Sequence, residues 1–326
     1  MMKQPLIILT GPTAAGKTDT SIALAKAVDG EIISADSMQV YRHMDIGSAK
    51  IRPEEMDGIP HHLIDVLEPE EDFNVVRFQE LAKRAIREIC SKGKIPILVG
   101  GTGFYIQAVL YDIDFTENDG DMSYRAFLEE TARREGAEYL HGMLEKVDPE
   151  AAEQIHAHNV KKVIRALEFH HQTGQKISEH NAREREKTSV YNSAYFVLTQ
   201  DRSVLYEKID RRVDQMMEAG LLDEVRALKA RGLDKNCVSM QGLGYKEILA
   251  YLDGAYSLDE AVRIIKRDTR HFAKRQLTWF RREKDVIWID KTGSVSAEEI
   301  VERQILPVLH KRNITGSFSG TQKDVS

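Results

Sequence analysis

The stretch LTGPTAAGKTDTS, residues 9–21, decides how the rest of the chain is interpreted. It matches the pattern G-x-x-x-x-G-K-[ST], whose fixed positions are occupied by Gly11, Gly16, Lys17 and Thr18. An apolar segment, 6–9, precedes it and an alanine-rich segment, 17–28, follows, which predicts the order strand, loop, helix. In such a loop, glycines let backbone N–H groups approach a polyphosphate, the lysine faces the terminal phosphates, and the threonine hydroxyl can ligate Mg²⁺. The default ligand of this pattern is ATP or GTP.

Further apolar segments predict the remaining strands of a sheet. They are 31–35, 62–67, 95–101, 194–199 and 286–290. The segment 73–93 is amphipathic and ends at Gly93, as expected for a helix between two strands. Strands that alternate with helices predict an α/β fold of the P-loop type, a parallel sheet with helices on both faces.

The strand pattern stops between residues 114 and 193. Four segments there are typical of helices: 123–136, 137–147, 149–159 and 160–174. We therefore expect an all-α insertion domain, 114–193, within a discontinuous core domain formed by 1–113 and 194–312. The polar segment 313–326 is expected to be a disordered tail.

Composition excludes several classes of protein. No apolar run approaches the ~20 residues that a membrane span needs, and the first residues lack the pattern of a secretory signal. Two cysteines, Cys90 and Cys237, cannot form a zinc site alone and give no disulfide framework. We expect a cytoplasmic protein without a membrane partner.

An acidic residue, Asp36, comes directly after the predicted strand EIISA. Many NTPases place such an acid near Mg²⁺, whereas here the segment 95–101 ends in Gly100 and Gly101. Because the carboxyl ends of parallel strands face the ligand crevice, we expect Asp36 to lie beside the phosphate loop. It could hold Mg²⁺ through water, act as a general base, or merely cap the turn that follows. In GGTGFY, 100–105, Thr102 offers a hydroxyl and an N–H group at the same edge.

A basic helix is predicted over 257–284. It carries nine Lys or Arg against four Asp or Glu, although the whole chain has a net charge of −6. Phe272, Trp279 and Phe280 are interleaved with the cations, and we expect the last two to belong to the core. A cationic stripe on an acidic protein indicates a phosphate-rich partner. The segment 160–165 adds Lys161, Lys162 and Arg165.

These motifs together resemble the bacterial tRNA dimethylallyltransferases, also called tRNA isopentenyltransferases, over about residues 5–290. Besides the phosphate loop, the segments that carry the resemblance are DSMQVYRHMDIGSAK (36–50), GIPHHLIDVLEP (58–69), GGTGFY (100–105), VIRALE (163–168), QGLGYKE (241–247) and KRQLTWFRR (274–282). The resemblance implies that the loop holds the diphosphate of dimethylallyl diphosphate. It implies that the dimethylallyl group passes to the exocyclic N6 of the adenosine on the 3′ side of the tRNA anticodon (position 37).

The resemblance also implies roles for individual residues. The implied catalytic residues are Asp36 as general base, Lys17, Thr13 and Arg212. The implied diphosphate-binding residues are Gly11, Pro12, Thr13, Ala14, Ala15, Gly16, Lys17, Thr18 and Arg212. The implied tRNA contacts are Asp36, Ser37, Met38, Gln39, Thr102, Arg125, Lys161, Lys162, Val163, Ile164, Arg165, Gln241, Gly242, Leu243, Gly244, Tyr245 and Lys246. The implied cofactor is Mg²⁺ on Thr18, and the implied partners of a monomeric enzyme are the anticodon stem-loop of tRNA and dimethylallyl diphosphate.

Three other functions share parts of this pattern. A small-molecule P-loop kinase would need ATP turnover, and no segment resembles a lid over a nucleoside. An adenylate isopentenyltransferase would use the loop and Asp36 but would have no use for the insertion and the basic helix. A non-enzymatic RNA-binding P-loop protein would leave Lys17, Thr18 and Asp36 without a role.

Overall fold

The computed structural model describes residues 3–115, 122–293 and 296–314. The chain divides into two compact units. One is formed by Met1–Leu110 together with Val190–Ser326, and the other is Tyr111–Ser189. Each unit is described below by itself.

The first unit contains a six-stranded sheet in the order β3-β2-β4-β1-β5-β6. The strands are β1 (Pro5–Thr10), β2 (Gly30–Ser34), β3 (His61–His62), β4 (Ile95–Gly100), β5 (Asn192–Thr199) and β6 (Val286–Asp290). All neighbouring strands pair in parallel, and Ile7 of the central β1 lies between Ile97 and Ala194. The predicted α/β fold class is confirmed.

The segment 62–67 was wrongly predicted to be a strand along its length. Only His61–His62 pairs with β2. Leu63 and Asp65 take positive φ angles of 63° and 55°, which end the extended conformation. Leu67 instead forms an isolated parallel bridge with Tyr41, so the segment turns toward the edge where the strands end.

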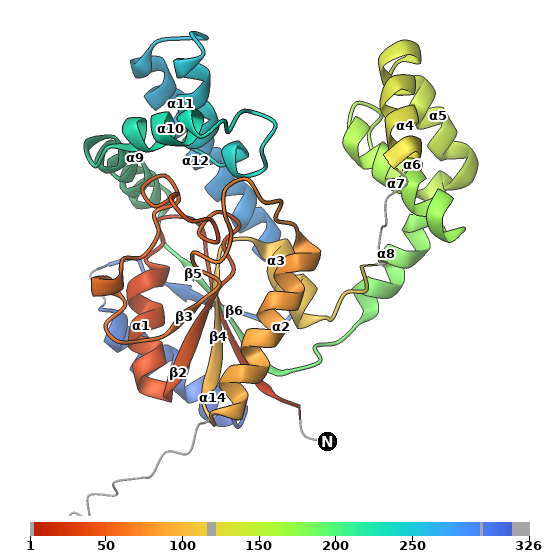
Figure 1. Cartoon of the computed structure of the whole chain (residues 1–326). Helices are drawn as coiled ribbons and strands as arrows, with labels where there is room; N and C mark the ends of the chain where they lie inside the picture. Colours follow the sequence, from red (N-terminus) through yellow and green to blue (C-terminus); the bar gives the residue numbers. More distant parts are fainter. Residues whose placement is uncertain (1–2, 116–121, 294–295, 315–326) are drawn as a thin grey trace, which may run out of the picture. The chain divides into compact units, whose positions relative to one another are not determined.

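Helices cover both faces of this sheet (Figure 1). On one face, α1 (Lys17–Val28) packs with α13 (Ala297–Ile300), η3 (Val301–Ile305) and α14 (Leu306–Lys311). On the other face lie α2 (Val75–Ser91) and α3 (Gly103–Leu110), where Phe78 and Tyr105 stack with ring centroids 4.5 Å apart. Ile314 is 1% exposed and belongs to the core against α14, although the sequence assigned it to the tail. Residues 315–326 of the expected tail lie outside the described residues.

Four helices gather beyond the carboxyl ends of the strands (Figure 1). They are α9 (Arg202–Glu218), α10 (Leu221–Ala230), α11 (Tyr245–Leu252) and α12 (Leu258–Phe280), with the short turns η1 (Pro53–Glu55) and η2 (Ser239–Gln241) elsewhere in the connecting loops. The predicted basic helix is α12, and the Ser257 side chain caps it by accepting from the Glu260 N–H. Phe280 is fully buried, as expected from the sequence.

The regular elements in the described parts of the second unit, 111–115 and 122–189, are helices. They are α4 (Met122–Glu135), α5 (Ala137–Val147), α6 (Pro149–Gln154), α7 (Val160–Thr173) and α8 (Ile177–Glu186). Leu128, Leu140, Leu144 and Leu167 form its core. The sequence did not predict α8, which is mostly polar. Buried Asp148 fixes its start by accepting from the backbone N–H and hydroxyl of Ser178 at 2.9 and 2.7 Å.

No helix among the described residues has the length and apolar character that a membrane crossing requires.

Candidate active site

The phosphate loop joins β1 to α1 and is held in shape by its glycines. Gly16 takes a φ of 78° at the start of α1, a left-handed conformation that favours glycine. A Cβ on Gly11 would lie 2.7 Å from the Leu198 carbonyl oxygen of β5, so a larger residue does not fit there. The Lys17 ammonium folds over the loop and donates to the carbonyls of Gly11 and Pro12 at 3.1 and 2.9 Å.

Lys17, Asp36 and Arg212 interact electrostatically at this loop. Burial and the nearby Arg212 guanidinium lower the pKa of Lys17 to about 8, while Asp36 opposes that change. Burial also lowers the pKa of Arg212, and Asp36 again acts in the opposite direction. Arg212 lies partly buried on α9, whereas its neighbour Arg211 is exposed. Two cations therefore share one carboxylate, an arrangement that favours an incoming anion.

Asp36 also caps the turn that follows β2. Its Oδ1 accepts from the N–H groups of Met38 and Gln39 at 2.8 and 3.3 Å. These bonds fix the carboxylate beside Tyr105, whose pKa rises to about 12 through burial and the charge of Asp36. The turn-capping role is thus present, and it fixes the position of the carboxylate.

A small cleft of about 60 Å³ opens between α1, β2 and β4. Its lining includes Lys17, Thr18, Ser34, Asp36, Gln39 and His61. Burial lowers the pKa of His61, whose Nδ1 lies 2.8 Å from the Ile59 carbonyl oxygen, so the neutral ring donates to that oxygen. Thr18 and Asp36 are the oxygen donors that suit Mg²⁺, which keeps several waters and needs only one or two protein ligands beside phosphate oxygens. Among the residues that the structure describes, no group of three or more His, Cys, Asp or Glu could hold a metal alone.

Helix α12 contacts the loop through Gln276, a residue that sequence reasoning missed. Its Oε1 accepts from the Thr13 N–H at 3.0 Å, and its Nε2 donates to the Gly101 carbonyl at 2.9 Å. A Cβ on Gly101 would lie 2.2 Å from that amide nitrogen, and a Cβ on Gly103 would lie 2.2 Å from Trp279. The glycines of GGTGFY are therefore needed because α12 approaches closely.

The opposite side of the loop is held by side chains that follow β5 and β6. The Gln200 amide donates to the Ala14 carbonyl at 3.3 Å, and Lys208 donates to Gln200 at 2.7 Å. Lys291 donates to the Thr20 hydroxyl at 3.1 Å. No local sequence pattern indicates these contacts, because single polar residues after strands have no distinguishing spacing.

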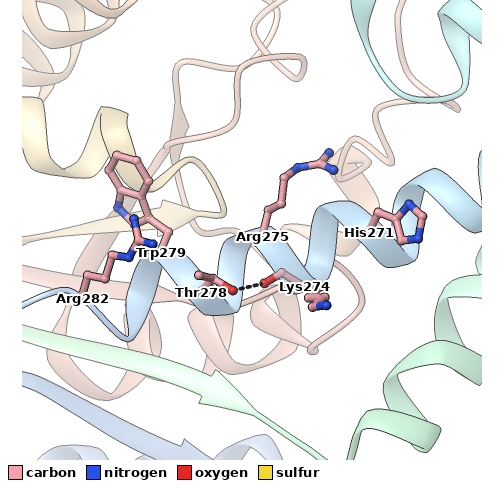
Figure 2. A pocket seen from close by; sticks show the side chains of 6 residues that line it. All are labelled: His271, Lys274, Arg275, Thr278, Trp279 and Arg282. Carbon is pink, nitrogen blue, oxygen red and sulfur yellow. Dashed lines mark hydrogen bonds between the residues drawn. The ribbon is translucent and has the colours of Figure 1, made fainter. Parts of the chain in front are cut away.

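A groove of about 380 Å³ runs along the outer face of α12. It is lined by His271, Lys274, Arg275, Thr278, Trp279 and Arg282 (Figure 2). Five of these side chains come from successive turns of α12, and Arg282 follows the end of that helix. Lys274, Arg275 and Arg282 are exposed. Three of the cations that the sequence places in this region, Lys274, Arg275 and Arg282, therefore line a hollowed surface.

The predicted tRNA contacts after η2 differ in their accessibility. Gln241 and Lys246 are exposed, and Leu243 is half-buried. Tyr245 is fully buried, and its hydroxyl donates to Glu224 at 2.6 Å, so its side chain does not reach the surface. The Met38 methyl would lie 2.7 Å from a Cβ on Gly242, which places the turn after Asp36 against this segment.

Within the second unit, the predicted contacts also fall into two groups. Lys161 and Lys162 are exposed. Val163 and Ile164 are 0% and 3% exposed and pack in the helical core, so the expectation that their side chains meet tRNA is not supported. Arg125 and Arg165 both lie near Glu168, and burial lowers the pKa of Arg165.

The fold and the site define a P-loop protein whose phosphate loop faces two cations and one carboxylate. The sequence profile of the family described as IPP transferase matches residues 39–283. A tRNA dimethylallyltransferase of Lachnoclostridium phytofermentans is 62% identical over 311 residues, covering 95% of this chain and 99% of that protein. One from Bacillus licheniformis is 54% identical over 297 residues, covering 91% and 94%.

Solved structures agree with these relatives. The tRNA isopentenylpyrophosphate transferase of Bacillus halodurans superposes with a TM-score of 0.73 at 47% identity, covering 96% of this chain and 99% of that chain. A eukaryotic dimethylallyltransferase acting on tRNA gives a TM-score of 0.81 at 29% identity, covering 95% and 79%. The chain belongs to the IPP transferase family of tRNA dimethylallyltransferases, and the resemblance drawn from its motifs is confirmed.

The pKa of Lys17 predicts how anion binding depends on pH. Below pH 8 the ammonium of the free protein is charged, and above pH 8 it loses its proton. The association constant for inorganic pyrophosphate should therefore fall by about tenfold between pH 7 and pH 9, relative to a Lys17→Arg variant that stays charged. Calorimetric titration measures the association constant for both proteins. Because the ionisation of pyrophosphate affects both equally, it drops out of their ratio. The same pH dependence in both would show that Lys17 does not titrate there.

Proposed function

We propose that the chain transfers the dimethylallyl group from dimethylallyl diphosphate to N6 of the adenosine on the 3′ side of the anticodon in tRNA. The observation that carries this proposal is the electrostatic cluster of Lys17, Arg212 and Asp36 at the phosphate loop. Two cations suit a diphosphate that gains charge as it leaves, and a carboxylate suits a nucleophile that must lose a proton. Family membership of the whole chain supports the same reaction.

Asp36 acts as the general base. The N6 amine is a weak nucleophile because its lone pair is delocalised into the adenine ring. As N6 attacks the allylic carbon, the C–N bond forms, the bond from that carbon to the diphosphate oxygen breaks, and Asp36 accepts the N6 proton. The turn bonds to Met38 and Gln39 hold its Oδ1 in place, so the carboxylate need not reorganise during the reaction.

The loop, Lys17 and Arg212 stabilise the leaving diphosphate. Partial burial removes competing water, which strengthens the interaction of both cations with the developing charge. Thr13 is part of the loop that binds the diphosphate, and its backbone N–H is held in position by a hydrogen bond to Gln276. Thr18 would hold Mg²⁺, which would neutralise part of the diphosphate charge when bound.

The tRNA binds through surfaces on both units. In the first unit these are the groove on α12, the exposed Gln241 and Lys246, Thr102, and the turn 36–39. In the second unit they are Arg125, Lys161, Lys162 and Arg165. The target base leaves its stack to reach Asp36, which costs least in a loop that already presents unstacked bases. The enzyme acts as a monomer in the cytoplasm, where its tRNA substrate is found.

A transfer assay tests the proposed function. The full chain is incubated with labelled dimethylallyl diphosphate and Mg²⁺, together with an unmodified anticodon stem-loop, AMP or ATP. Label should enter the stem-loop, and a stem-loop with guanosine in place of the target adenosine should accept none, since the N6 amine is missing. Equal labelling of AMP would favour an adenylate isopentenyltransferase. Hydrolysis of ATP that depends on Lys17 would favour a kinase.

Asp36→Asn tests the general base. The amide oxygen can still accept from Met38 and Gln39, so the turn is expected to remain, while the basicity is lost. We expect kcat to fall by ~10²-fold or more with little change in the affinity for the stem-loop. Single-turnover transfer measures the chemical step directly. An unchanged single-turnover rate would limit Asp36 to a binding role.

Arg212→Ala tests the diphosphate clamp, and Arg211→Ala is its matched control. Arg212 lies near Lys17 and Asp36, whereas Arg211 is exposed on the same helix. We expect Arg212→Ala to lower kcat/KM for dimethylallyl diphosphate by ~10²-fold and Arg211→Ala to change it little. Steady-state kinetics with saturating stem-loop make the comparison. Equal, small losses in both variants would remove Arg212 from the site.

A further inference from the structure

We propose that Gln276 is a positioning residue that couples occupancy of the RNA groove on α12 to diphosphate binding at the phosphate loop. The inference rests on the proposed function, because it takes the groove to be an RNA surface. The Gln276 amide is buried and lies on the face of α12 that is turned away from the groove. Its consequence is that RNA and diphosphate each strengthen the binding of the other.

The two faces of α12 meet different partners. Lys274, Arg275 and Thr278 line the outer groove, while Gln276 and Ala273 are buried on the inner face. Successive residues of a helix point about 100° apart, so a helix held through its outer face cannot rotate without moving the inner one. RNA phosphates on the outer cations would therefore restrict the position of the Gln276 amide.

The Gln276 amide hydrogen-bonds the inner face of α12 to the loop, beside an apolar cluster that includes Ala273 and the loop residue Ala14. Gln276 is 6% exposed and uses both ends of its side chain. Its oxygen accepts from Thr13 of the loop at 3.0 Å, and its nitrogen donates to Gly101 after β4 at 2.9 Å. A buried amide satisfied at both ends is costly to displace, because each lost bond leaves a buried polar group unpaired. The amide thus fixes the loop residue Thr13 relative to α12 and β4.

A second glutamine, Gln107 on α3, offers a matched control. Its amide donates to Glu283 at 2.7 Å and ties α3 to the segment just after α12, with no bond to the phosphate loop. Removing the Gln107 amide should weaken the packing of α3 against the end of α12, while the hydrogen bond between Gln276 and Thr13 remains. Gly101→Ala offers an independent test, because its Cβ would lie 2.2 Å from the Gln276 nitrogen and expel the amide.

The experiment measures pyrophosphate affinity with and without a guanosine-substituted anticodon stem-loop, which cannot react. In the parent protein, the stem-loop should tighten pyrophosphate binding by about fivefold or more. In Gln276→Met, which keeps the length but loses both bonds, the ratio should approach one, whereas Gln107→Met should retain the parent ratio. In transfer kinetics, Gln276→Met should raise KM for dimethylallyl diphosphate more than Gln107→Met does. Thermal melting compares the folded state of all variants.

Two results would overturn the inference. One is a parent ratio of one, since no coupling would then exist. The other is a parent-like ratio in Gln276→Met or, if that variant does not fold, in Gly101→Ala. The outcome is separate from that of the transfer assay, because binding of pyrophosphate and stem-loop is measured without any reaction. A parent protein that couples the two ligands but transfers no label would refute the proposed function and leave the coupling intact.

Discussion

The structure depends on a partly buried excess of positive charge at the end of a parallel sheet. Lys17 and Arg212 approach one carboxylate, Asp36, and the pKa of Lys17 falls to about 8 because burial and Arg212 disfavour its charge. Such a cluster is stable only where surrounding elements force it together, and a bound anion relieves the repulsion. Residues after β4, β5 and β6 and helices α9 and α12 all converge on this loop. The packing therefore leaves a site whose charge suits an anion such as the proposed diphosphate.

Helices α10 and α11 hold the loop that follows the turn at Asp36. Glu224 on α10 accepts from the backbone N–H groups of Asp45, Ile46 and Gly47. Buried Tyr245 donates to the same carboxylate, and a Cβ on Gly47 would lie 2.6 Å from its ring. The long motif 36–50 is therefore largely a scaffold. Its residues after the turn fix the loop against α10 and α11, while its start, Asp36, lies near Lys17 and Arg212.

The sequence predicted those features that depend on short, contiguous patterns. The phosphate loop, the parallel sheet, the basic helix and the family all follow from segments that can be interpreted locally. Gln276 and Thr13 are separated by 263 positions, so no local pattern could reveal their contact. Val163, Ile164 and Tyr245 were assigned to tRNA because they lie within motifs, but motif membership does not distinguish a core residue from a surface one. Helix α8 was missed because its polar sequence has no apolar period.

In the proposed reaction, one site brings a diphosphate to Lys17 and Arg212 and an extruded adenosine to Asp36. A crystal structure of the full chain with an unreactive thio analogue of dimethylallyl diphosphate and an anticodon stem-loop tests it most directly. We predict the diphosphate on the phosphate loop and the adenine N6 within ~3 Å of an Asp36 carboxylate oxygen. An adenosine that remains stacked in the RNA, or an N6 atom beyond hydrogen-bond reach of Asp36 with both ligands bound, would contradict it.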